Sequence, residues 1–203
     1  MGHKQQTLYE ERIQSRSYFH FLIGLIPRIL PYIYFSYCRY IARKKGAKIG
    51  KNVLLHYQLA KKLNNKISIG DKTSIDTIHI DTRAKLKIGN NVIIGNGVEI
   101  ITCSHNIDSS EWEFKPYGLV IEDYVWLATK STILPSCRII KRGAVIGAFS
   151  VVVKNVDEMN VVAGNPASHL KNRKEIHRKV CIESLRGGDL TTYVKAYIKR
   201  SKQ

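Results

Sequence analysis

Cysteine is scarce in this sequence of 203 residues, and no two cysteines stand close together. The four are Cys38, Cys103, Cys137 and Cys181, which occur singly and never as a Cys-x-x-Cys pair. This spacing argues against a zinc knuckle and gives no reason to expect a disulfide framework. We therefore expect the chain to work in a reducing compartment.

Acidic residues are also few, since 16 Asp and Glu stand against 33 Lys and Arg, for a formal net charge of +17. The imbalance lies at the two ends. Residues 1–53 hold 10 basic residues against 2 acids, residues 171–203 hold 10 against 3, and the centre is nearly neutral. Basic flanks attract phosphate, whether on nucleic acid, on an anionic membrane surface or on a phosphorylated cofactor. Charge alone leaves these three partners open.

The sequence lacks an unbroken apolar run of the about 20 helical residues that a bilayer requires. Residues 18–45 come nearest, but Pro27, Arg28, Pro31 and Arg39 divide them into shorter pieces. Their aromatic and aliphatic residues beside a Lys/Arg cluster predict a pair of amphipathic helices within an N-terminal segment, residues 1–45. Two alternatives stay open for this segment: it packs on the main domain or another subunit, or it contacts a membrane surface.

What the sequence does contain is a six-residue repeat that begins near Ile67. Hexads such as "IGNNVI", "IGNGVE", "IEDYVW" and "IGAFSV" start with an aliphatic residue and carry a small or β-branched residue at the fifth place. A helix would need apolar residues every three to four positions, and a half-buried strand every second one. A six-residue period instead predicts a parallel β-helix, in which the aliphatic residues stack inside as a ladder. The Gly, Asn and Asp residues that follow each aliphatic suit the turns.

Three segments interrupt the repeat. Residues 55–65 fall outside it and predict an early insertion, and residues 138–145, "RIIKRGAV", hold one residue too many and predict a bulge. The longest interruption covers residues 106–120, which contain no convincing hexad, and the repeat resumes at Ile121. Loops on a rigid scaffold are where chemistry tends to lie.

Several motifs in residues 46–173 resemble those of the hexapeptide-repeat acyltransferases, in the branch of O-acetyltransferases that act on sugars and bacterial polysaccharides. The motifs are "AKIGKNV", "IGNNVIIGNGVEIITCSHNID", "IEDYVWLATKSTILP", "GAVIGAFSVVVKNV" and "VVAGNPA". The resemblance implies an all-β fold, a left-handed parallel β-helix over residues 46–168, between the short N-terminal helical segment and a basic C-terminal helical tail, residues 169–203. It also implies acetyl-CoA as the acetyl donor, a homotrimer with active sites between subunits, a sugar or glycan acceptor, and no metal.

His105 is the candidate catalytic residue. In the register that begins at Ile100, His105 holds the sixth place of its hexad, so its side chain should point outward where the long loop begins. Acetyl transfer from a thioester to a hydroxyl needs a base of near-neutral pKa, which an imidazole supplies. The resemblance also assigns the family's catalytic histidine to His105.

The cofactor side of the site follows mainly from the resemblance. It implies that Thr129, Ala148, Val153 and Lys154 line a groove for the pantetheine arm of acetyl-CoA. Lys171 and Arg173 either pair with the phosphates of CoA or belong to a solvated basic tail. Trp126 also holds an outward sixth place and should meet either the cofactor or the next subunit. A backbone N–H near Ala128 is a candidate donor to the oxyanion.

The acceptor side is less defined by the sequence. His79 and Asp81 lie in an irregular hexad and are candidates to line the acceptor pocket. Asp108, three residues after His105, either orients the imidazole or caps its own loop.

Other functions remain to be weighed against acetyl transfer. A metal-dependent carbonic anhydrase of similar fold would need three histidines converging on zinc, and Ser109 and Ser110 stand where further histidines would be expected. A degenerate basic scaffold that binds membrane or nucleic acid, and an acetyltransferase of small molecules such as antibiotics, are the alternatives. No basic aromatic motif of an RNA-binding module occurs, so we expect no nucleic-acid partner. We expect a cytoplasmic protein that contacts the inner face of a bacterial membrane if its N-terminal segment is peripheral.

Overall fold

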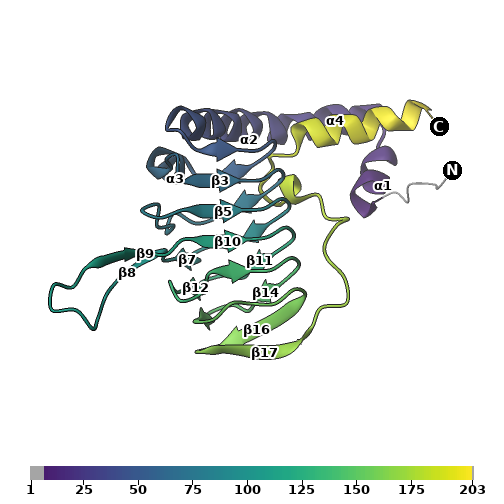
Figure 1. Ribbon diagram of the computed structural model, residues 1–203. Coiled ribbons are helices and arrows are strands. Elements are labelled where there is room, and N and C mark those ends of the chain that lie inside the picture. Colours follow the sequence, from purple (N-terminus) through teal and green to yellow (C-terminus); the bar gives the residue numbers. More distant parts are fainter. Residues whose placement is uncertain (1–6, 203) are drawn as a thin grey trace.

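A computed structural model describes residues 7–202, so the first six residues of the predicted N-terminal segment lie outside the described part. Its central feature is a left-handed parallel β-helix of about 6 turns with three faces (Figure 1). The parallel β-helix predicted from the six-residue repeat and the left hand implied by the family resemblance are therefore confirmed.

Each face of the β-helix is a stack of short parallel strands. The first face contains β1 (Lys48–Ile49), β3 (Ile67–Ile69), β5 (Leu86–Ile88), β10 (Leu119–Ile121) and β13 (Ile139–Ile140). The second contains β2 (Leu54–Leu55), β4 (Ser74–Ile75), β6 (Ile93–Ile94), β11 (Trp126–Leu127) and β14 (Val145–Ile146), then β16 (Asn160–Gly164) with its antiparallel partner β17 (Ala167–Asn172). The third contains β7 (Glu99–Ile100), β12 (Thr132–Ile133) and β15 (Val151–Val152).

The aliphatic residue that opens each hexad points into the coil. On the second face Ile94, Leu127 and Ile146 are in register and at most 1% exposed. The fifth-place residues are buried as well, as Val92 and Val125 illustrate. This ladder is the main hydrophobic core of the molecule, and burial of its apolar area is the main source of its stability.

The interruptions of the repeat have different structural outcomes. The early insertion forms α3 (Tyr57–Lys62), which takes the place of the third face in the first coil and buries Leu59 and Ala60. The bulge predicted within residues 138–145 is wrong, because Ile140 and Ile146 keep the regular spacing of six. The extra residue instead lies in the turn between Ile133 and Ile140, where the amide of Cys137 donates to the Leu134 carbonyl at 3.0 Å.

The corner between the third and the first face, here called the variable corner, carries the longest insertion. Residues 101–118 leave the coil there as a hairpin of β8 (Cys103–His105) and β9 (Phe114–Pro116). The amide of Tyr117 donates to the Thr102 carbonyl at 2.9 Å and closes the base of the hairpin. The hairpin projects away from the coil stack (Figure 1).

One long helix, α2 (Tyr18–Lys44), lies across the N-terminal end of the stack (Figure 1). The division of residues 18–45 into two helices is therefore wrong, since α2 runs through Pro27 and Pro31 without a break. Prolines inside a helix cost about 3 kcal/mol or more each, but here the helix is fixed by tertiary packing of a buried stripe that includes Phe35, Cys38 and Ala42. Length and apolar composition would also let this helix cross a membrane, contrary to the expectation from the sequence.

The C-terminal part of the chain returns to the N-terminal end (Figure 1). After β17 it runs to η1 (Ile182–Arg186), α4 (Leu190–Ile198) and η2 (Lys199–Lys202), and α4 packs on α1 (Leu8–Gln14) and α2. Phe21 stacks on Tyr193 with ring centroids 5.2 Å apart, in a second small core with Ile13 and Ala196. Helices from the two ends of the described chain, α1, α2 and α4, thus pack together, and the tail becomes helical only beyond β17.

Candidate active site

His105 lies on the projecting hairpin and is exposed, as its register predicts. Its Nδ1 is 2.8 Å from the carbonyl oxygen of Trp112. A carbonyl oxygen only accepts, so Nδ1 carries the hydrogen and donates it. The lone pair of the neutral ring is then on Nε2, which is the atom left to accept a proton.

Two aromatic rings flank the imidazole. The ring centroids of Trp112 and Phe114 lie 5.6 Å and 6.0 Å from that of His105. Trp112 has a left-handed backbone, with φ of 52°, in the turn that brings its carbonyl to His105. Asp108 makes no contact with the imidazole and is exposed, so the group that orients His105 is the Trp112 carbonyl. No residue pattern in the sequence predicts this partner.

Four of the predicted cofactor-binding residues lie close together. Trp126 is 44% exposed on β11, and Ala128 and Thr129 follow it in the corner between the second and third faces. Ala148 holds the same corner one coil later, where the amide of Phe149 donates to the Thr129 carbonyl at 3.0 Å. The Ala128 amide donates to the Ile146 carbonyl at 3.0 Å and is therefore occupied. The adjacent Thr129 amide has no acceptor within the described residues.

The other predicted cofactor-binding residues lie elsewhere. Val153 and Lys154 follow β15 at the variable corner, and Lys171 is exposed on β17. Arg173 is half-buried beside the corner between the first and second faces, where its guanidinium donates to the Gly143 carbonyl at 3.2 Å. It also lies 2.9 Å from Nδ1 of His177. Burial lowers the pKa of Arg173, and its donors fasten the returning chain to the coils.

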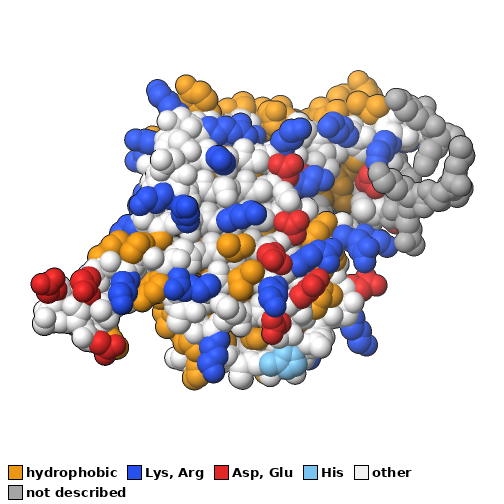
Figure 2. Space-filling view, viewed as in Figure 1, with side chains coloured by type: hydrophobic (Ala, Val, Ile, Leu, Met, Phe, Trp, Pro, Cys, Tyr) orange, Lys and Arg blue, Asp and Glu red, His pale blue; other side chains and the backbone are white. Residues whose placement is uncertain are grey.

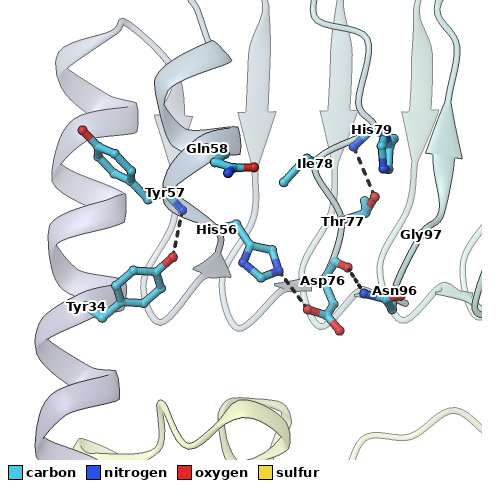
Figure 3. Close-up of a pocket in the computed structure, with 10 residues that line it drawn as sticks. All are labelled: Tyr34, His56, Tyr57, Gln58, Asp76, Thr77, Ile78, His79, Asn96 and Gly97. Atoms are coloured by element: carbon cyan, nitrogen blue, oxygen red, sulfur yellow. Dashed lines mark hydrogen bonds and ion pairs between the residues drawn. The ribbon is translucent and has the colours of Figure 1, made fainter.

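A cavity of about 600 Å³ opens between α2, α3 and the second coil (Figure 3). It is lined by Tyr34, His56, Tyr57, Gln58, Asp76, Thr77, Ile78, His79, Asn96 and Gly97. The cavity combines two tyrosine rings with one carboxylate, two side-chain amides and two imidazoles. Of the two residues predicted for the acceptor pocket, His79 lines this cavity and Asp81 does not.

Asp81 instead anchors the base of the hairpin. Its carboxylate forms an ion pair with Arg83 at 2.9 Å and accepts the amide of Thr102 at 3.2 Å. Burial acts to raise the pKa of Asp81, but the hydrogen bonds from Arg83 and Thr102 outweigh it and hold that pKa well below its usual range. The carboxylate is therefore charged and fully engaged at neutral pH.

Comparison with known proteins identifies the family, although no protein-family model matches the chain. The chain is 30% identical over 146 residues to the putative colanic acid biosynthesis acetyltransferase WcaF of Escherichia coli, covering 71% of this chain and 80% of that protein. It belongs to the hexapeptide-repeat acetyltransferases. It is also 32% identical over 108 residues to the putative lipopolysaccharide biosynthesis O-acetyl transferase WbbJ of E. coli, covering 47% of this chain and 55% of that protein.

Solved structures share the fold of this acetyltransferase. A hexapeptide-repeat-containing acetyltransferase from Vibrio cholerae superposes with a TM-score of 0.62 at 24% identity, covering 86% of this chain and 97% of that one. The same Vibrio protein solved with acetyl-coenzyme A gives a TM-score of 0.59 at 23% identity, covering 82% and 84%. Within residues 7–202 of this acetyltransferase, no three His, Cys, Asp or Glu side chains converge as metal ligands.

A polar cluster at the edge of the cavity is not among the residues predicted from the sequence. Nε2 of His56 lies 3.0 Å from Oδ1 of Asp76, and Nη2 of Arg186 lies 3.1 Å from the same imidazole nitrogen. Arg186 also donates to the Ile75 carbonyl at 2.9 Å. His56, Asp76 and Asn96 are each 20 residues apart, which is about one coil, so this spacing was a signal that they stack. Arg186 lies in the C-terminal tail, and no residue spacing in the sequence predicts its contact with His56.

Proposed function

We propose that this acetyltransferase moves the acetyl group of acetyl-CoA to a hydroxyl of a sugar unit in a bacterial surface polysaccharide or its precursor. The observation that supports it most directly is the 2.8 Å hydrogen bond from Nδ1 of His105 to the Trp112 carbonyl. That bond leaves Nε2 free as a base on an exposed loop. The family membership supplies the reaction class.

In the proposed mechanism, Nε2 of His105 removes the proton of the acceptor hydroxyl as its oxygen attacks the thioester carbonyl. A backbone N–H holds the oxyanion of the tetrahedral intermediate, and the Thr129 amide is the candidate because the Ala128 amide is occupied. The imidazolium then returns the proton to the departing CoA thiolate. The proton taken from the acceptor hydroxyl thus leaves with CoA, and the proposed reaction uses no metal.

Incubating the purified protein with labelled acetyl-CoA and a panel of free sugars, sugar nucleotides, surface glycans and chloramphenicol tests this proposal. We expect transfer of label to a glycan or sugar hydroxyl. Label that goes only to chloramphenicol would contradict the proposed acceptor class and favour the small-molecule alternative.

We propose a homotrimer in which the hairpin of one subunit meets the coil surface of the next. The hairpin exposes three apolar side chains, those of Ile107, Trp112 and Phe114, which are 78%, 60% and 46% exposed. Trp126 is also exposed, on the coil. Such surfaces usually mark a contact. We expect light scattering to give the mass of three chains, and an active monomer would contradict the proposal.

We propose that the cavity of Figure 3 receives the acceptor, because tyrosine rings beside a carboxylate and amides suit a sugar ring and its hydroxyls. Replacing His79 with alanine is then expected to raise the acceptor KM roughly three-fold to ten-fold, the usual effect of losing one hydrogen bond. The KM for acetyl-CoA should stay unchanged. His169→Ala is the matched control, since His169 is an exposed histidine on β17. Equal KM values for both variants would contradict the assignment.

The proposed setting is the cytoplasm, with peripheral contact at the inner face of the membrane and no nucleic-acid partner. Acetyl-CoA as a donor fits this setting, and so do four free thiols.

A further inference from the structure

The side of α2 that faces away from the coils is apolar along its whole length. We call these residues the outer face of α2: Tyr18, Phe19, Leu22, Ile23, Ile26, Ile29, Leu30, Ile33, Tyr37 and Tyr40. Leu30 is 76% exposed and Ile26 is 68% exposed. In Figure 2 the hydrophobic side chains gather along this end of the molecule. A continuous exposed surface of this kind marks a binding face.

The inner face of α2 is fastened to the rest of the protein at several points along the helix. Arg28 forms an ion pair of 3.1 Å with the buried Asp189. Nη1 of Arg39 donates to the Val53 carbonyl at 3.0 Å, and Nη2 of Arg43 donates to the Ile49 carbonyl at 2.8 Å. A helix that crossed a bilayer would lose these contacts and leave Asp189 buried without its cation. The helix is therefore held parallel to the end of the β-helix.

The charged side chains on α2, α3 and α4 have one sign. The sequences of α2, α3 and α4 contain no Asp or Glu. Arg43, Lys44, Lys61 and Lys62 are exposed at the ends of α2 and α3, and Arg200 follows α4. An apolar helix face bordered by Lys and Arg complements a lipid surface with anionic headgroups, whereas a solvated protein surface would mix both signs.

We propose that the outer face of α2 inserts into the headgroup region of an anionic membrane, with the helix in the membrane plane and the β-helix standing away from it. Tyr34 is 40% exposed on α2 and also lines the cavity of Figure 3, and the Tyr57 amide donates to its hydroxyl at 3.0 Å. In this arrangement the cavity opens at the level of the lipid headgroups. An acceptor glycan carried on a lipid would reach the cavity at that level. Only this last statement rests on the proposed function.

Co-sedimentation with vesicles tests the proposal. The full-length protein should bind vesicles that contain phosphatidylglycerol at low salt, bind pure phosphatidylcholine vesicles more weakly, and be partly released by high salt, because salt screens only the charged contribution. Protein that stays in the supernatant with both kinds of vesicle would overturn the proposal. Protein that resists alkaline extraction would indicate a spanning helix and overturn the in-plane arrangement.

Two variants and a control assign the binding to the outer face. Ile26→Ser with Leu30→Ser should lower vesicle binding about ten-fold or more, since two exposed aliphatic side chains no longer enter the lipid. Lys44→Gln with Lys45→Gln should weaken binding to phosphatidylglycerol vesicles and leave binding to phosphatidylcholine unchanged. Leu170→Ser is the matched control, because Leu170 is 63% exposed on β17 at the opposite end of the coils.

The remaining outcomes are also decisive. If the Ile26/Leu30 variant binds vesicles as tightly as the wild type, or if its mass by light scattering falls, the face contacts something other than lipid and the proposal is wrong. Acetyl transfer to a soluble acceptor should be unchanged in these variants. A wild-type protein that transfers acetyl groups but does not bind vesicles would leave the proposed function standing and overturn the membrane proposal. A wild-type protein that binds vesicles but is inactive would overturn the proposed function and leave the membrane proposal standing.

Discussion

Replacing His105 with alanine is expected to lower turnover by roughly 100-fold to 10,000-fold, the usual range for loss of a general base. The variant removes the imidazole, which is the one hairpin group that accepts a proton in the proposed mechanism. It leaves the aliphatic ladder untouched, because His105 is exposed and lies outside the hydrophobic core. Binding of acetyl-CoA, which we assign to the corner of Thr129 and Ala148, should change only a few-fold.

Steady-state kinetics with the labelled donor, alongside a thermal melt, measures this effect. Asp108→Asn is the matched control in the same loop, since Asp108 makes no contact with the imidazole, and we expect it to be close to wild type. Full activity in a folded His105→Ala protein would show that the hairpin has another purpose.

Replacing Leu127 with alanine is expected to lower the free energy of unfolding by about 3 kcal/mol, within the range for a buried leucine. Leu127 is fully buried in the middle coil, in register between Ile94 and Ile146. Its loss opens a cavity between two coils whose backbones are held by parallel strand pairing, so the ladder cannot collapse to fill the space.

Chemical denaturation measures this change. Leu185→Ala serves as the control, because Leu185 is 53% exposed and its truncation should cost under about 0.5 kcal/mol. Equal losses in the two variants would contradict the view that the aliphatic ladder carries the stability of the β-helix.

The features that could be predicted from the sequence are those set by short-range periodicity. The six-residue spacing predicted the inward position of residues such as Ile94 and the outward position of His105, because both follow from counting along one coil. Pro27 and Pro31 predicted a break in the helix, but α2 is continuous because its packing across the stack outweighs their local effect.

Contacts between distant segments could not be predicted. Arg186 joins His56 and Asp76 only because the tail returns along the coils, and the same return occupies the donors of Arg173. The Trp112 carbonyl beside His105 is a backbone group, and its direction depends on a left-handed turn that a tryptophan gives no reason to expect.

The variable corner has a consequence for how such a protein can evolve. Of the three corners, this one holds both the hairpin of residues 101–118 and the extra residue before Ile140, while the strands on either side keep their register. A gene can therefore lengthen, shorten or replace the chain at this corner without shifting a single ladder position. Hairpins of different length and sequence can therefore be exchanged on an unchanged scaffold. A chimaera that carries a relative's hairpin between Thr102 and Gly118 should fold with the coils intact.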